Sequence, residues 1–192
     1  TILAISVLAL SVRTIVRNRD WANEDNLWIS SAKVSPNDPN VLNNLGDMYY
    51  RQKNYQKYIE SFEKAIKLIP SYADAYNNLA NTQLALFIEN NDQKYLNDAT
   101  SNYLQSIKYN PLLWQPHQSL GIIYYNLKEN NKAIDEFRQA IKINPTNINL
   151  QYNLGLIYFN SKQMDKAKEV FTNALKLDPK NQAVLNLLNQ IK

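Results

Sequence analysis

The side chains that most enzymes use for catalysis are scarce in this sequence. The 192 residues contain no cysteine and one histidine, His117, so metal ligands could come only from carboxylates. His117 is expected to be a core side chain, because nothing nearby in the sequence supplies a partner that would orient it as a base. Asp135 and Glu136 are adjacent, so they diverge around a helix and are expected to face solvent. We therefore predict no catalytic residue, no metal site and no cofactor in these residues.

Carboxamide side chains are abundant by contrast, with 28 asparagines in the chain. Asn44 and Asn78 are 34 residues apart, and Asn153 follows Ser119 by the same interval. Because a carboxamide both donates and accepts hydrogen bonds, a row of them could pair with a peptide backbone whatever its side chains are. Nearby polar residues that would extend this row are Asn43, Asn77, Asp47 and Asn81. Whether the row exists depends on the elements that carry these residues.

The element is clearest at residues 148–181, where two helices are predicted on either side of a polar break at 160–163. Both show residues at the spacing of one helix face, most of them small or apolar. These residues are Gln151, Leu154, Gly155 and Tyr158 in the first helix and Ala167, Phe171 and Ala174 in the second. Pro179 follows the second helix, where helices commonly end.

The same spacing recurs along the chain. The three glycines, Gly46, Gly121 and Gly155, fall at the eighth position of a repeat. Five of the seven prolines fall at the thirty-second position, namely Pro36, Pro70, Pro111, Pro145 and Pro179. This pattern resembles the signature of the tetratricopeptide-repeat family, whose repeats have 34 residues. The resemblance covers residues 20–192 and implies an all-α fold, an α-α superhelix of stacked helix pairs.

We predict a half repeat at 20–38, full repeats at 39–72, 73–113, 114–147 and 148–181, and a capping helix at 182–192. The second repeat has 41 residues, and the seven extra residues around 89–97 are expected to lengthen both helices and to project a polar turn. Little apolar surface is expected to be packed there. In the first repeat, Tyr58 replaces the usual small residue, and Gly46 is expected to make room for its ring.

The family resemblance also implies where the asparagine row lies. In tetratricopeptide arrays, positions 2, 5, 6, 9 and 13 of each first helix line a concave groove, and the row occupies positions 5, 6 and 9. It resembles the asparagine ladder of the O-GlcNAc transferase repeats, which implies binding of an extended peptide or protein segment. The alternative is a solvated polar face. A lysine clamp for a C-terminal carboxylate is excluded, because positions 2, 5, 6 and 9 carry no lysine or arginine.

Residues 1–12 are small and apolar, and Arg13, Arg17 and Arg19 follow them. Twelve helical residues span about 18 Å, less than the roughly 30 Å of the bilayer core. We interpret residues 1–19 as the end of a membrane helix and its basic flank; the alternative is a capping helix packed on the first repeat. Residues 20–192 contain 18 basic and 17 acidic side chains, too even a balance for a nucleic-acid surface.

A second resemblance lies at this junction. Residues 13–21, followed by Leu27, Ala32, Lys33 and Pro36, are similar to the entry to the repeats in transmembrane-and-tetratricopeptide O-mannosyltransferases. This resemblance implies extracytoplasmic repeats that select protein substrates for a membrane-embedded glycosyltransferase, whose catalytic acids would lie upstream. The arginines favour the opposite, cytoplasmic side. The competing interpretation is a free-standing membrane-anchored adaptor for complex assembly, with no enzymatic parent.

Overall fold

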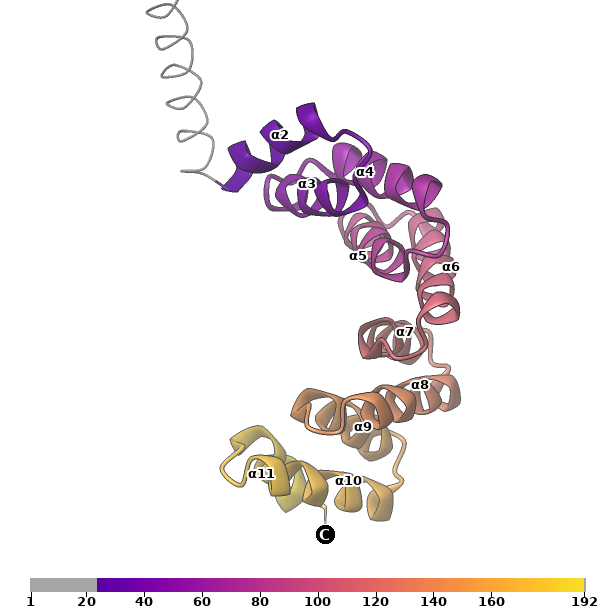
Figure 1. Ribbon diagram of the computed structural model, residues 1–192. Coiled ribbons are helices and arrows are strands. Elements are labelled where there is room, and N and C mark those ends of the chain that lie inside the picture. Colours follow the sequence, from indigo (N-terminus) through magenta and orange to yellow (C-terminus); the bar gives the residue numbers. More distant parts are fainter. Residues whose placement is uncertain (1–23, 192) are drawn as a thin grey trace, which may run out of the picture. The chain divides into compact units, whose positions relative to one another are not determined.

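The computed structural model describes residues 24–191, and within this range the chain forms ten α-helices and no strand (Figure 1). The predicted membrane-helix end and basic flank at 1–19 lie outside the described residues. The ten helices are α2 (Glu24–Val34), α3 (Pro39–Arg51), α4 (Tyr55–Leu68), α5 (Ala73–Asn90), α6 (Gln93–Tyr109), α7 (Trp114–Asn126), α8 (Asn130–Ile143), α9 (Ile148–Asn160), α10 (Met164–Leu177) and α11 (Gln182–Gln190). The all-α prediction is confirmed. None of the helices in residues 24–191 combines the length and hydrophobicity needed to span a bilayer.

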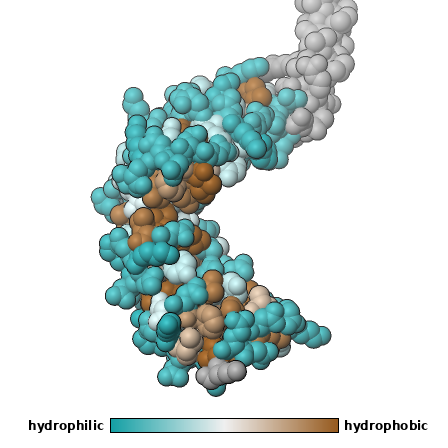
Figure 2. Space-filling model, turned by 180° about the vertical axis from the view of Figure 1, so that it is seen from behind, coloured by the Kyte–Doolittle hydropathy of each residue, from teal (hydrophilic) through white to brown (hydrophobic). Residues whose placement is uncertain are grey.

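The chain divides into two compact units, one ending at Ala99 and the other beginning at Thr100, and within them α3 packs on α4, α7 on α8 and α9 on α10. The core of the first unit includes Leu42, Tyr58, Phe62, Ala65, Ala75 and Leu79. In the second unit, the core runs from α8 to α11 and ends on Val184, which is fully buried. Figure 2 shows one face of the molecule, where hydrophilic residues dominate and hydrophobic residues form patches between them. The amphipathic helices thus bury one side each, as stacked helix pairs require.

Glycine sets the closest approach within three of the helix pairs. A Cβ atom added to Gly46, Gly121 or Gly155 would come within 3.0 Å of a phenylalanine ring on the second helix of the pair. The rings belong to Phe62, Phe137 and Phe171, respectively. The expectation that Gly46 accommodates Tyr58 is therefore wrong. The ring of Phe62, one helical turn after Tyr58 on α4, occupies the space beside Gly46 instead.

Tyr58 connects two helix pairs instead. Its ring centre lies 4.6 Å from that of Phe62, and its hydroxyl group donates a hydrogen bond of 2.9 Å to the backbone carbonyl of Asn78 on α5. The side chain is 3% exposed, so the hydrogen bond satisfies a phenol that would otherwise be buried without a partner. A large residue at this position therefore fixes α5 against α4.

The helix before the first full repeat, α2, contacts α3 and the turn that follows it. The carboxylate of Asp25 accepts hydrogen bonds from Arg51 at 2.8 Å and from Gln52 at 3.1 Å. No residue of α2 is fully buried, although Trp28 and Ala32 pack against the apolar side chains of α3. The half-repeat helix is thus held by polar contacts at its start and by partial apolar packing along its length.

The second repeat has the longest helices of residues 24–191. α5 has 18 residues where α3, α7 and α9 have 13, and α6 has 17 where α4, α8 and α10 have 14. The turn between them is reduced to Asn91 and Asp92, and Asn91 has the left-handed φ of 53° that asparagine tolerates. Leu86 and Leu96, on either side of the turn, are 9% and 5% exposed. The expectation that little apolar surface is packed here is therefore wrong.

Candidate functional site

The only histidine has an orienting partner, contrary to expectation. Nδ1 of His117 on α7 lies 2.6 Å from Oε2 of Glu136 on α8, so Glu136 is not a freely solvated side chain. Sequence reasoning missed this pair because the two residues are 19 positions apart and meet only when α8 folds back on α7. His117 is 8% exposed, which leaves little access for a substrate. The pair joins two helices rather than forming an accessible catalytic site.

Three of the predicted binding residues are brought together in the first unit. Nδ2 of Asn78 on α5 donates a hydrogen bond of 3.1 Å to Oδ1 of Asn43 on α3, and Nδ2 of Asn77 lies 3.4 Å from Oδ1 of Asn78. We call these three residues the amide cluster. All three are partly buried, and Oδ1 of Asn77 is buried with no hydrogen-bond partner. The cluster therefore retains an acceptor that a ligand donor could reach only after the Asn77 side chain rotates toward the surface.

Asn44 does not take part in these hydrogen bonds. Its Nδ2 donates to the backbone carbonyl of Asn40 at 2.7 Å, one turn earlier in the same helix. This local bond competes with contacts to a ligand, because asparagine readily pairs with nearby backbone groups. The structure thus assigns the contact between repeats to Asn43, one residue before the position given most weight by the sequence.

Asp47 follows the amide cluster by one turn of α3. It is partly buried, and no hydrogen bond or ion pair of contact length reaches its carboxylate from residues 24–191. Burial raises the pKa of this carboxyl group, nearby Arg51 lowers it, and Glu24 raises it further. Such a carboxylate favours a ligand that brings a hydrogen-bond donor or a positive charge. Asn81, the remaining predicted residue of this unit, is exposed on α5.

The second unit has a less polar surface at the equivalent helix positions. Asn153 on α9 and Ser119 on α7 are both partly buried. The residues around them are Tyr152, Leu156 and Ile122, the last of which is 41% exposed. Sequence reasoning passed over these apolar residues because it followed asparagine alone. Apolar residues at the ninth position of the third and fourth repeats, where the first two have Asp47 and Asn81, were the signal that could have identified them.

Comparison with known proteins gives the family. The family models described as TPR repeat and Tetratricopeptide repeat match residues 46–86 and 121–162, and residues 148–181, respectively. Together they cover more than half of the chain. The chain belongs to the tetratricopeptide-repeat family. It is a repeat scaffold of the kind typical of protein–protein interaction.

Solved tetratricopeptide-repeat structures agree with this fold. TTC0263 from Thermus thermophilus is 23% identical, with a TM-score of 0.68 and coverage of 96% of both chains. YrrB, described as a TPR protein with an unusual peptide-binding site, is 15% identical, with a TM-score of 0.69 over 85% of this chain and 81% of YrrB. At these identities the likeness shows the fold alone.

Curated relatives include two O-mannosyltransferases. Drosophila melanogaster Protein O-mannosyl-transferase Tmtc2 is 35% identical over 79 residues, which are 40% of this chain and 8% of that protein. Mus musculus Protein O-mannosyl-transferase TMTC3 is 31% identical over 80 residues, 42% of this chain and 9% of its own length. The chain thus spans less than a tenth of these relatives, and it matches them only in the repeat region.

Proposed function

We propose that the repeats bind an extended peptide segment and that the amide cluster is the main contact. The observation that carries this proposal is the buried, unpaired Oδ1 of Asn77 beside the hydrogen bond from Asn78 to Asn43. A buried acceptor without a partner costs about 1–3 kcal/mol, and a peptide N–H group would offset that cost once the Asn77 side chain has rotated toward the surface. Binding through backbone groups would tolerate many side chains, as a protein that selects varied substrates requires.

The carboxylate of Asp47 favours segments rich in hydroxyl or basic side chains. Burial raises the pKa of Asp47 because it removes water from the carboxylate. A ligand donor that reaches the carboxylate would replace the hydrogen bonds lost with that water. Serine and threonine hydroxyl groups are donors of suitable size for a partly buried carboxylate. A Ser/Thr-rich unstructured peptide is therefore the first ligand to test.

We propose further that the repeats are the substrate-selecting domain of a membrane-embedded protein glycosyltransferase. The similarity to two O-mannosyltransferases in their repeats supports this, as do the apolar run at 1–12 and the three arginines after it. The parent protein would be membrane-attached through residues 1–19, with extracytoplasmic repeats. The basic flank instead supports cytoplasmic repeats, and the accessibility of residues 24–191 to added protease in sealed membranes would decide the side.

The alternative is a membrane-anchored adaptor with no enzymatic parent. It is favoured by the restriction of the enzyme matches to the repeats, which occur in many scaffolds. The sequence upstream of residue 1 in the gene separates the two functions. Several further membrane spans with acidic loops would support the glycosyltransferase, whereas a start codon a few residues upstream would leave the adaptor.

Calorimetric titration with a Ser/Thr-rich peptide tests the binding surface. Replacing Asn77 and Asn78 together by alanine removes two amides at about 0.5–1.5 kcal/mol each, so affinity should fall roughly fivefold to 150-fold. Asn131→Ala, at an exposed position on α8, is the matched control and should change nothing. Ser119→Asn should tighten binding if the second unit contributes. Equal affinities for all four proteins would mean that the asparagines form only a solvated face.

A further inference from the structure

The two compact units differ in charge. Residues 24–99 contain 7 basic and 10 acidic side chains, a net charge of −3, whereas residues 100–191 contain 10 basic and 6 acidic ones, a net charge of +4. Among the lysines and arginines of residues 100–191, only Lys132 forms an ion pair with a carboxylate, that of Glu129. Most of the positive charge of the second unit is therefore not paired with an acid of the same unit.

Two interhelical turns of the second unit lie side by side. Nδ2 of Asn160, at the end of α9, donates a hydrogen bond of 2.6 Å to the hydroxyl group of Tyr125, at the end of α7. Nδ2 of Asn130, at the start of α8, donates one of 3.1 Å to Oγ of Ser161. We call residues 125–132 and 160–166 the basic edge. Its charged residues are four lysines and two acids, namely Lys128, Lys132, Lys162, Lys166, Glu129 and Asp165.

Lysine holds an unfavourable backbone conformation in both turns. Lys128 and Lys162 are exposed and have φ values of 64° and 58°, in the region that favours glycine or asparagine. Asparagine does occupy this conformation at Asn91, where φ is 53°. Since asparagine would suit the two turns better, the lysine side chains contribute something other than stability.

Aromatic rings restrain these lysines without neutralising them. Three ammonium groups lie over tyrosine rings: Lys128 over Tyr125 at 6.0 Å, Lys132 over Tyr124 at 5.3 Å and Lys166 over Tyr158 at 5.6 Å. A tyrosine ring carries no net charge, so the positive charge is kept while the side chain is held. A ligand that pairs with these lysines therefore loses less side-chain entropy than it would with freely moving ones.

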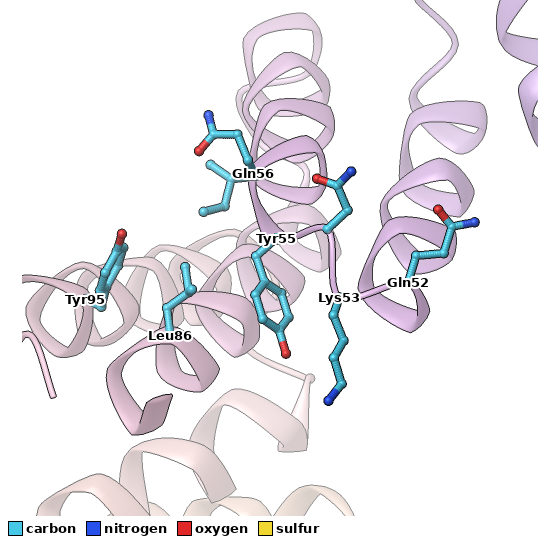
Figure 3. Close-up of a pocket in the computed structure, with 8 residues that line it drawn as sticks. Gln52, Lys53, Tyr55, Gln56, Leu86 and Tyr95 are labelled. Atoms are coloured by element: carbon cyan, nitrogen blue, oxygen red, sulfur yellow. The ribbon is translucent and has the colours of Figure 1, made fainter. Parts of the chain in front are cut away.

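The equivalent turn of the first unit is bonded to carboxylates instead. Lys53 extends from this turn, between α3 and α4 (Figure 3). Three neighbouring side chains donate hydrogen bonds to acids: Gln52 to Asp25, Tyr55 to Glu89 and Gln56 to Glu60. In the second unit, the hydrogen bonds between the two turns join neutral side chains only. The basic edge is thus the place where a carboxylate from outside the chain would be complementary.

The composition of the basic edge favours an acidic protein segment over a membrane or a nucleic acid. Of its large apolar side chains, only Leu127 is exposed, whereas a membrane-binding surface inserts several. The rings of Tyr124, Tyr125 and Tyr158 lie beneath cations, so they are not free to stack on bases. Carboxylates need neither feature.

We propose that the basic edge binds an aspartate- and glutamate-rich segment of a partner protein. Carboxylates of the segment pair with Lys128 on the first turn and with Lys162 and Lys166 on the second. Because the two turns are in contact, a segment of a few residues reaches the lysines of both. This proposal is independent of the one for the amide cluster, which lies in the other unit.

The test is an NMR titration of the 15N-labelled 192-residue chain with two N-acetylated hexapeptide amides, Asp-Glu-Asp-Glu-Asp-Glu and Asn-Gln-Asn-Gln-Asn-Gln. Saturable shifts of the backbone amides of Lys128, Lys132, Lys162 and Lys166 are expected with the acidic peptide and none with the neutral one. Raising the ionic strength from about 0.05 M to about 0.3 M should weaken binding, because exposed ion pairs are screened by salt.

Replacing Lys128 and Lys162 together by asparagine separates binding from folding. This turn variant should be at least as stable as the wild type in urea unfolding, because asparagine tolerates the left-handed backbone. Its affinity for the acidic peptide should nevertheless fall roughly twofold to thirtyfold, from the loss of two exposed ion pairs.

The matched control is Lys142→Gln together with Lys176→Gln, which removes the same charge from the last turns of α8 and α10. These lysines lie about 15 Å along the helix from Lys132 and Lys166, where salt screens much of the attraction. The control should therefore lose less affinity than the turn variant. Replacing Asn77 and Asn78 by alanine should leave binding of the acidic hexapeptide intact.

Four results would overturn the proposal. The first is no saturable shift with the acidic peptide. The second is an equal loss of affinity in the turn variant and the control, which would make the attraction an effect of net charge alone. The third is the same set of shifts with inorganic phosphate, which would assign the edge to small anions. The fourth is tighter binding of a thymidine hexanucleotide than of the acidic peptide, which would assign it to nucleic acid.

Discussion

The ammonium group of Lys57 lies 5.4 Å from the centre of the Tyr49 ring, so a cation on α4 covers an aromatic ring on α3. The equivalent pairs are Lys132 with Tyr124 at 5.3 Å and Lys166 with Tyr158 at 5.6 Å. The second repeat has Gln83 and Asp98 at these two positions. The tyrosine of the repeat signature thus joins the two helices of a pair by a cation–π contact as well as by packing.

Replacing Lys57 by methionine tests this contact, because methionine keeps the apolar part of the side chain. We expect the free energy of unfolding to fall by about 0.5–1 kcal/mol, the usual value of an exposed cation–π pair. Urea unfolding of Lys57→Met, Tyr49→Leu and the double variant gives the coupling energy. Lys168→Met, with no ring beneath an exposed lysine in the described structure, is the control. A coupling energy of zero would contradict the assignment.

Lysine occupies a strained backbone conformation in three interhelical turns. Lys53, Lys128 and Lys162 have φ values of 56°, 64° and 58°, in the left-handed region that favours glycine or asparagine. We expect Lys162→Asn to raise the free energy of unfolding by about 0.5–1 kcal/mol, since asparagine tolerates this region better. The reverse change, Asn91→Lys, should lower it by a similar amount. Thermal unfolding of both variants checks the two signs together.

The carboxyl group of Asp47 makes a pH-dependent contribution to stability. Burial raises its pKa above the ordinary value of 3.8, against the attraction of Arg51 and with a smaller effect of Glu24. The folded protein therefore holds this proton to higher pH than the unfolded chain does, and stability falls as the pH rises above about 3.8. We expect Asp47→Asn to be more stable than the wild type at pH 7. The difference should vanish below about pH 3.8, where the carboxyl group is protonated in both the folded and the unfolded chain. A difference that is constant from pH 3 to 7 in urea unfolding would be inconsistent with this.

Two seven-residue deletions test how the insertion is packed. Removing residues 89–95 retains Leu86 and Leu96 but loses Tyr95, the hydrogen bond to Glu89 and the Asn91–Asp92 turn, which the second deletion also loses; we expect a loss of about 1–3 kcal/mol. Removing residues 90–96 instead replaces buried Leu96 by Glu89, and a larger loss of about 2–5 kcal/mol is expected. Urea unfolding of the two deletions provides the comparison. Equal stabilities would mean that Leu96 contributes little to the core.

The fold was predictable because its determinants are local in sequence. Gly155, Phe171 and Pro179 repeat at fixed spacing, and that spacing alone specifies two helices and a stop. The burial of Leu96 was not predictable, because the insertion interrupts the periodic pattern at the place where this residue stands. The choice of rotamer was also beyond the sequence. Asn44 bonds to its own helix while Asn43 receives the amide of Asn78, and both arrangements fit the same spacing.

The contact between Gly46 and Phe62 has a consequence for how such a gene can change. Both partners of the contact lie within one repeat, and so do the partners of the two equivalent contacts. A duplication or deletion with ends in the connections between helix pairs carries each glycine together with its own ring. A crossover within a pair could join a first helix bearing alanine, as at Ala80, to a second helix whose phenylalanine needs the missing space. Recombination is therefore expected to preserve whole repeats, and length variation is expected at the ends of helices, as in α5 and α6.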